Sequence, residues 1–252
     1  MAEKAVILAD MGAIDGTTTL VGLIGDPVSG SLSPRMQNAA FDARGLDWAY
    51  VPLRVEHAAL GDAVAGLGAL GFAGANVTTP HKTSVIPFCS DLDESAERAG
   101  SVNTLLIRGG HVHGSSTDAE ALDEIADVSS AAVVGAGGAS GAWVAALEAR
   151  GIPVRVFARR GTWPPETGDA DLVVHATLVK DEVLFEPRVG QTLVELAYFQ
   201  DGRDTAHAAA ARAVGATVVD GLEVLVRQGA ASFERWTGVP APLDVMRAAI
   251  RP

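Results

Sequence analysis

Residues 131–160 read AAVVGAGGASGAWVAALEARGIPVRVFARR, and this stretch decides the fold class. An apolar run leads into a glycine-rich turn, then into an alanine-rich helical segment, and then into a second apolar run. A strand, a tight turn, a helix and another strand in about thirty residues are typical of a βαβ unit. The stretch therefore predicts a largely parallel sheet with helices packed on its faces.

Strand-like and helical runs alternate on both sides of this unit. Before it come strand-like runs at 18–25, 48–55 and 72–78, helical runs at 33–45 and 57–70, and a hairpin at 102–115 that turns at Gly109-Gly110. After it come strand-like runs at 171–177, 192–198 and 216–220, an alanine-rich helix at about 204–214 and an amphipathic helix at 221–236. We expect two α/β units with a boundary near residues 123–130, and the cleft between two such domains is a usual place for a ligand.

Composition and charge restrict the kinds of partner. The chain has 252 residues, is 48% hydrophobic and carries a net charge of −12. It can therefore bury a core, and its electrostatic field argues against nucleic acid or an anionic membrane as a partner. A small anionic ligand remains compatible with this charge, because donors within contact distance outweigh distant, screened charges.

We expect a cytoplasmic protein without a membrane partner or a metal site. Residues 1–12, MAEKAVILADMG, lack a cleavage signature, so we predict no signal peptide, and no apolar run reaches the roughly 18 residues of a membrane span. The single cysteine, Cys89, permits no internal disulfide. His111 and His113 alternate on the hairpin without an evident third ligand, so we interpret them as an exposed strand face, and His81 as a surface histidine.

The glycine-rich turn predicts a nucleotide site. Residues 135–140, GAGGAS, match the first two glycines of the dinucleotide-binding pattern and carry serine at the third position. Such turns let backbone N–H groups approach a pyrophosphate at a helix N-terminus. A plain strand–helix connection also needs small residues, but the complete βαβ context favours nucleotide binding. The candidate cofactor-binding residues of this turn are Gly135, Gly137, Gly138, Ala139 and Ser140.

The end of the following strand indicates which nucleotide binds. A site for NAD places an acidic residue about twenty positions after the glycines, whereas this strand ends in Ala158-Arg159-Arg160. An acid there would repel a 2′-phosphate, while arginine offers it paired donors. An arginine pair is also common on solvated loops. Its position relative to the glycines nevertheless predicts NADP as the cofactor, with Arg159 and Arg160 among its ligands.

Short polar side chains follow the strands of the N-terminal half. Open α/β sheets bind ligands outside the carboxyl ends of their strands. A compact polyhydroxy ligand would need a set of short donors and acceptors at that edge. The candidates are Ser31, Ser33, Asn76, Thr78, Asn103 and Asp118.

Lys82, the last residue of NVTTPHK (76–82), is one of 3 lysines beside 16 arginines, so its use here requires a reason. Hydride delivery to a ketone builds an alkoxide that needs a proton, and lysine can supply one whereas arginine effectively cannot. A carboxylate such as Asp118 would hold the ammonium group. The alternatives are a surface cation at a helix start for Lys82 and a helix N-cap for Asp118.

Together these motifs resemble the shikimate dehydrogenase family from about Val21 to Trp236. The matching stretches are GDPVSGSLSP (25–34), NVTTPHK (76–82), GSVNT (100–104), STD (116–118), GAGGAS (135–140) and DGLEVLVRQ (220–228). The resemblance implies two α/β domains. Residues 1–122 would form a substrate domain with a mostly parallel sheet, completed by C-terminal helices at 221–252. Residues 123–220 would form a Rossmann-like NADP-binding domain.

The resemblance also implies an activity and the residues that perform it. The reaction would be the NADP-dependent reduction of 3-dehydroshikimate to shikimate, with Lys82 and Asp118 as the catalytic pair, in a monomer or homodimer. The substrate would be held by Ser31, Ser33, Asn76, Thr78, Asn103, Tyr198 and Gln228.

Several residues depart from the family pattern. Gly30 and Gln37 stand at frequent histidine positions, Ser116 at an asparagine position, and Glu223 at a glycine position, where we interpret it as a solvated helix residue. HATLVKDE (175–182) differs from the family's Asn-Ala-Thr loop beside the nicotinamide. Two alternatives therefore stay open. One is a paralogue that acts on quinate or an amino-substituted shikimate, and the other is an NADP-binding sensor without turnover.

Overall fold

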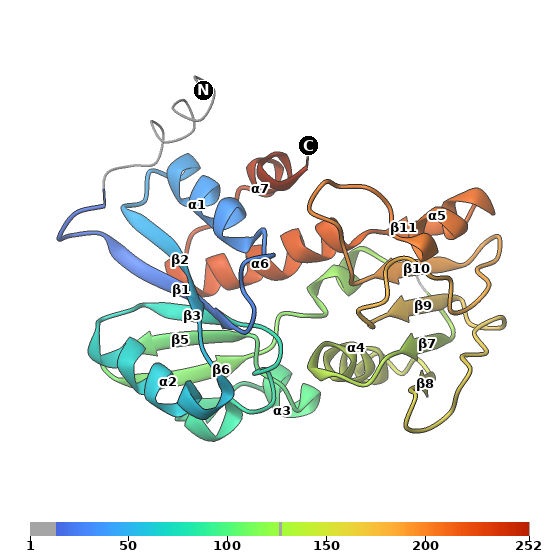
Figure 1. The fold of residues 1–252 in the computed structure, drawn as a ribbon, viewed down its shortest axis with the longest axis horizontal. Helices are drawn as coiled ribbons and strands as arrows, with labels where there is room; N and C mark the ends of the chain where they lie inside the picture. The colour runs from blue at the N-terminus through green and yellow to red at the C-terminus, as the bar shows by residue number, and fades with distance from the viewer. Residues whose placement is uncertain (1–13, 126–127, 252) are drawn as a thin grey trace.

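The computed structural model describes residues 14–125 and 128–251. Residues 1–12, on which the signal-peptide expectation rests, lie outside this range, as do residues 126–127 of the expected domain boundary. The described residues form two sheets that lie side by side, with helices packed on them (Figure 1). The α/β fold class expected from the sequence is confirmed.

The first sheet contains six strands from the N-terminal half of the chain. They are β1 (Thr19–Gly25), β2 (Trp48–Arg54), β3 (Gly74–Val77), β4 (Asp91–Leu92), β5 (Thr104–Arg108) and β6 (His111–Ser115). Their order is β2-β1-β3-β5-β6-β4. β1 pairs in parallel with β2 and β3, whereas β5 is antiparallel to both β3 and β6. The helices of this half are α1 (Ser33–Ala43), α2 (Leu60–Ala69) and α3 (Glu94–Ala99).

The second sheet contains five strands in the order β11-β10-β9-β7-β8, all paired in parallel. They are β7 (Ala131–Val134), β8 (Val154–Phe157), β9 (Leu172–His175), β10 (Thr192–Glu195) and β11 (Thr217–Val219). Helix α4 (Gly138–Ala149) connects β7 to β8, so residues 131–160 fold as the predicted βαβ unit. Helix α5 (Ala206–Ala213) precedes β11.

The last two helices, α6 (Gly221–Thr237) and α7 (Leu243–Ile250), return to the first sheet (Figure 1). The apolar stripe predicted for 221–236 is buried there against β1, α1 and α7. This core includes Val21, Phe41, Leu222, Leu225, Val226, Phe233, Trp236, Met246 and Ile250. The packing agrees with a first domain completed by the C-terminal residues, although the exact boundaries stay a prediction. No helix within the described ranges is long and apolar enough to cross a membrane.

Glu223 is not the solvated helix residue expected from the sequence. It accepts hydrogen bonds from Arg227, one turn later on α6 (3.0 Å), and from Arg247 on α7 (2.8 Å). Burial would raise the pKa of Glu223, but the hydrogen bonds from Arg247 and Arg227 hold it below its usual value. The sequence did not reveal this role, because the main partner of Glu223 is Arg247, which lies 24 positions later on another helix. Glu223 joins the two C-terminal helices.

Helix α6 meets the first sheet at Gly74. The indole N–H of Trp236 donates to the backbone oxygen of Leu105, 2.9 Å away, directly beside this glycine. A Cβ added at Gly74 would lie 2.3 Å from that oxygen and 2.4 Å from the indole nitrogen. Only a residue without a side chain allows the helix to approach the sheet this closely.

We expect Gly74→Ala to lower the free energy of unfolding by about 1–3 kcal/mol, because the added methyl group overpacks a buried contact. Gly66→Ala is the matched control. Gly66 lies inside α2, where an added Cβ meets nothing within 4 Å, so alanine should raise stability by about 0.5–1 kcal/mol. Chemical denaturation of both variants checks the pair, and equal effects would contradict this packing.

Candidate functional site

Lys82 and Asp118 meet beyond the carboxyl ends of β3 and β6 in the first sheet. The Lys82 Nζ lies 2.6 and 2.7 Å from the two carboxylate oxygens of Asp118. Their side chains are 17% and 7% exposed, so Lys82 is not a surface cation. The short helical turn at Glu120–Glu124 has Ala119 at its N-cap and no side-chain cap, so Asp118 does not cap it. A largely buried amine and carboxylate in direct contact can hold and exchange a proton.

Asn103 connects this pair to helix α6. The backbone N–H of Thr117 donates to Asn103 Oδ1 over 2.8 Å, which fixes the orientation of the amide. The Nδ2 group therefore faces Asp118 Oδ1 at 2.8 Å and Gln228 Oε1 at 3.0 Å. Three residues predicted separately from the sequence, Asn103, Asp118 and Gln228, thus form one hydrogen-bonded chain. Asp118 Oδ1 accepts from both Asn103 and Lys82.

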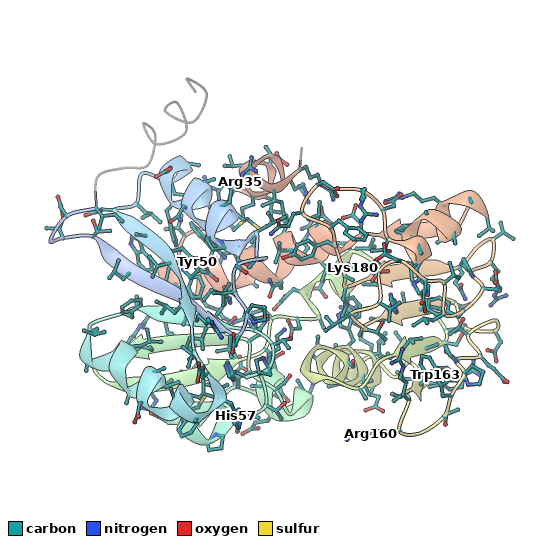
Figure 2. The ribbon with its side chains drawn as sticks, in the orientation of Figure 1. Arg35, Tyr50, His57, Arg160, Trp163 and Lys180 are labelled. Atoms are coloured by element: carbon teal, nitrogen blue, oxygen red, sulfur yellow. The ribbon has the colours of Figure 1, made fainter. Side chains whose placement is uncertain are left out.

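Asn76 lies deeper than the other candidates, next to a residue that the sequence analysis missed. The hydroxyl of Tyr50, a residue of β2 labelled in Figure 2, donates to Asn76 Oδ1 at 2.9 Å. Asn76 Nδ2 donates to Ser232 Oγ at 2.9 Å and to the Asn103 backbone oxygen at 3.0 Å. Burial raises the pKa of Tyr50 well above its usual range. A hydroxyl in the apolar strand at 48–55 was the available signal for such a network.

The two serines of the first loop lie next to Tyr198, which follows β10 of the second sheet. Ser31 Oγ donates to Ser33 Oγ at 3.1 Å. Burial raises the pKa of Tyr198, while hydrogen bonding with the Leu32 backbone and Ser31 acts to lower it. Lys180, labelled between the two sheets in Figure 2, donates to the Tyr198 backbone oxygen at 2.6 Å. Ser31, Ser33 and Tyr198 therefore gather from both halves of the chain.

The remaining N-terminal candidate, Thr78, directly follows β3. Its backbone N–H donates to the Ile24 oxygen at 2.8 Å. Its methyl group packs on Gly25, where an added Cβ would lie 2.4 Å from Thr78 Cγ2. The structure thus places Thr78 at the carboxyl ends of β1 and β3, as expected from the strand pattern.

The end of the glycine turn, where α4 starts, lies beside Lys82. Ser101 Oγ donates to the Gly138 backbone oxygen at 2.9 Å. A Cβ added at Gly138 would lie 3.0 Å from Lys82 Cβ. The candidate proton-transfer pair and the candidate nucleotide turn are consequently neighbours, as a reaction between a nucleotide and a substrate would require.

Two pockets border the turn. One of about 450 Å³ is lined by Gly135, Ala136, Trp163 and the arginine pair at 159–160, and one of about 350 Å³ is lined by residues that include Gly135, Gly137 and Ser140. Figure 2 shows Arg160 and Trp163 in the loop after β8. The Arg159 guanidinium lies 5.8 Å from the Trp163 ring centroid, which suits a stacked, charged ligand.

The turn itself is shaped to bring backbone close to a ligand. Gly135 has a φ of 133°, which favours glycine. The Ser140 side chain is buried and accepts a hydrogen bond from the Gly137 N–H at 3.1 Å. Gly137, Gly138 and Ala139 form the start of α4. The residues present therefore fit a nucleotide phosphate, with Ser140 acting inside the turn.

The histidines of the first half are placed differently from each other. His81 is fully buried with Nε2 2.7 Å from the Val55 oxygen, so the surface position expected from the sequence was wrong. The turn at 79–82 packs against the end of β2 and directs this side chain inward. His111 and His113 lie on the exposed side of the hairpin, and both contact Asp91.

A buried cluster in the second sheet was missed entirely. The ligand-type atoms of His175, Glu195 and His207 lie within 4.8 Å of one another, and it is the one cluster of this kind in the described part of the chain. The three residues are separated in sequence, and each by itself resembles an ordinary polar residue in an apolar segment. No sequence pattern pointed to their contact.

Two family profiles match the chain. The profile of the shikimate dehydrogenase substrate binding domain matches residues 23–105, and that of the shikimate 5′-dehydrogenase C-terminal domain matches residues 221–251. A protein of Anaeromyxobacter sp. (strain Fw109-5) named shikimate dehydrogenase (NADP(+)) is 40% identical over 275 residues. That similarity covers 94% of this chain and 97% of the relative.

Solved structures show the same fold. The shikimate 5-dehydrogenase of Thermus thermophilus, in complex with NADP(H) and shikimate, matches with a TM-score of 0.83 and 30% identity, covering 92% of this chain and 98% of that one. The quinate dehydrogenase of Corynebacterium glutamicum, in complex with NAD, matches with a TM-score of 0.78 and 26% identity, again covering 92% and 98%.

We expect Gly135→Ala and Gly137→Ala to weaken NADP⁺ binding for different reasons. Gly135 has a positive φ, and a Cβ added there would lie 2.6 Å from the Ala176 backbone oxygen. Protein stability and NADP⁺ affinity should therefore both fall. At Gly137 nothing lies within 4 Å, so stability should be kept while the methyl group obstructs a phosphate. Thermal unfolding and equilibrium titration test the difference. Unchanged affinity in both variants would exclude the turn as a phosphate site.

Proposed function

The chain belongs to the shikimate dehydrogenase family, and we propose that it interconverts 3-dehydroshikimate and shikimate. Relatives named shikimate dehydrogenase (NADP(+)) align with nearly its whole length, so the protein is an NADP-dependent oxidoreductase. The observation that carries the specific proposal is the contact between Lys82 and Asp118 beside the glycine turn.

Lys82 and Asp118 have complementary parts in this proposal. NADPH, when bound, supplies the hydride that reduces the substrate carbonyl. In that direction, Lys82 Nζ donates a proton to the oxygen that becomes a hydroxyl, and in the reverse direction it accepts the proton. Asp118 holds the ammonium group in place and stabilises its charge. Proton transfer by a positioned side chain contributes about 10²- to 10⁴-fold in rate.

The other residues divide into cofactor and substrate contacts. The turn at 135–140 would hold the pyrophosphate, and Arg159 and Arg160 the 2′-phosphate. Hydroxyls and amides around the pair would hold the carboxylate and hydroxyls of the substrate. These are Ser31, Ser33, Thr78, Asn103, Tyr198 and Gln228, with Asn76 supporting Asn103 from below. We propose a cytoplasmic enzyme, in keeping with its single cysteine.

A paralogue that acts on quinate is the second candidate. It is favoured by the structural similarity to a quinate dehydrogenase. A sensor without turnover has less support, because such a protein would not need an amine paired with a carboxylate beside the cofactor turn. A panel of shikimate, quinate and aminoshikimate with NADP⁺ and NAD⁺ separates all three. Reduction of NADP⁺ in the presence of shikimate supports our proposal. Cofactor binding without turnover of any of the three substrates refutes it.

We expect Lys82→Ala to lower kcat by about 10²- to 10⁴-fold with little change in the KM for shikimate, because the proton moves in the transition state. Lys82→Arg is the matched control, since it keeps the charge but cannot give up the proton. It should be nearly as slow as Lys82→Ala. Steady-state kinetics decide this, and a weakened KM at unchanged kcat would make Lys82 a binding cation only.

We expect Arg159→Ala to raise the KM for NADP⁺ by about 10- to 100-fold while leaving that for NAD⁺ nearly unchanged, because charged hydrogen bonds to the 2′-phosphate are lost. Arg155→Ala is the control. Arg155 is an exposed residue of β8 that pairs with Asp169, and it does not line the 450 Å³ pocket. Cofactor selectivity that stays the same in Arg159→Ala would remove this assignment.

A further inference from the structure

A polar network lies buried behind the wall of the larger pocket. His175 ends β9, Glu195 ends β10, and His207 lies in α5; each is at most 1% exposed. The proposed reaction uses none of them. Most buried polar side chains in proteins are hydrogen-bonded, so the partners of these three residues indicate what they do.

The Glu195 carboxylate is held by donors whose direction is fixed. The Ala197 backbone N–H donates to Oε1 at 3.0 Å. The Thr205 hydroxyl donates to Oε2 at 2.8 Å and accepts the Ala208 N–H at 3.2 Å. Both carboxylate oxygens thus accept hydrogen bonds, which favours His175 Nδ1 as a further donor to them.

His175 connects the Glu195 carboxylate to the loop at 176–180. Its Nδ1 lies 2.9 Å from both Glu195 oxygens, and its Nε2 lies 2.7 Å from Thr177 Oγ1. Thr177 Oγ1 accepts the Val179 backbone N–H at 3.2 Å, so its own proton is free to face the imidazole. Every hydrogen bond is made when His175 Nδ1 donates to Glu195 and Nε2 accepts from Thr177. The chain then runs from Thr177 through His175 to Glu195.

His207 supports the next part of the same wall. Its Nε2 accepts the backbone N–H of Leu184 at 2.8 Å. Burial and the neighbouring His175 lower the pKa of His207 to about 3, which keeps this nitrogen an acceptor at neutral pH. The anchored residues Thr177, Val179 and Leu184 all line the 450 Å³ pocket together with Arg159.

A metal ion is the other occupant that such a cluster could take. However, Glu195 and His175 already use both of their ligand-type atoms in hydrogen bonds within the chain. Only His207 Nδ1 lacks a partner among the described residues of this cluster. A metal would have to break several of these bonds, so the geometry favours a hydrogen-bonded support over a metal site.

We propose that Glu195, His175 and His207 are positioning residues that fix the pocket wall formed by Thr177, Val179 and Leu184 for NADP. The inference rests on the proposed function, since it takes this pocket to be the cofactor site. It also assigns a role to the sequence HATLVKDE, which differs from the family pattern. The network acts through the loop, without touching the reacting atoms.

The test breaks the chain at both ends and measures NADP⁺ binding directly. Thr177→Val removes the hydroxyl that meets His175, and Glu195→Gln removes an acceptor from the other end. Both should raise the NADP⁺ dissociation constant by about 3- to 10-fold, with the KM for shikimate nearly unchanged. Thr177→Ser, which keeps the hydroxyl, should bind NADP⁺ with the affinity of the wild type.

Thr167→Val is the matched control. Thr167 is a threonine only 2% exposed whose hydroxyl has no partner among the described residues, so this variant should bind NADP⁺ normally. Should Glu195→Gln fail to fold, the milder Thr177→Val still decides the question. Wild-type affinity for NADP⁺ in Thr177→Val overturns the proposal, and so does a Thr177→Ser variant that binds as weakly as Thr177→Val.

Metal analysis of the purified protein completes the experiment. One zinc ion per chain that is lost in His207→Ala would replace the proposal with a metal site. Because the titration requires no turnover, a protein that binds NADP⁺ but does not oxidise shikimate would refute the proposed function alone. Failure of the positioning role is seen separately, as unchanged NADP⁺ binding in the variants.

Discussion

The contact between the Lys82 ammonium and the Asp118 carboxylate is the interaction on which the rest of the site depends. A largely buried amine or carboxylate is costly without its partner, so the fold must bring both groups to the same place. Asn103 donates to Asp118 Oδ1, which Lys82 also contacts, and joins the pair to Gln228 on α6. The Gly138 backbone lies against Lys82 on the nucleotide side. The pair is thereby fixed between a substrate edge and a cofactor turn.

This arrangement makes the site sensitive to packing far from it. Gln228 is in place only if α6 lies close to the first sheet, and that approach needs Gly74 beside Trp236. Glu223 fastens α7 to the same helix through Arg247. On the cofactor side, the loop after β9 depends on buried groups of β10 and α5. The residues on the substrate side and on the cofactor side of the site are thus both held by partners distant in sequence.

Local patterns in the sequence were enough for the architecture and for much of the site. Periodicity and the glycine turn predicted the βαβ unit at 131–160, and the rarity of lysine together with the strand ends led to Lys82 and Asp118. The sequence did not reveal Tyr50, the inward direction of His81, the pairing of Glu223, or the His175–Glu195–His207 cluster. Each depends on a partner brought from another element, and residue type alone does not encode such contacts. Helix α3, a segment of only six residues, was not predicted either, and α7 was expected only through the family resemblance.

The most direct test of the central claim is a crystal structure of the protein with NADP⁺ and shikimate bound. Our account predicts that Lys82 Nζ lies within hydrogen-bond distance, about 2.6–3.2 Å, of the substrate hydroxyl that is oxidised, while still contacting Asp118. A substrate bound in the cleft with that hydroxyl facing another side chain, and Lys82 directed away from it, would contradict the account.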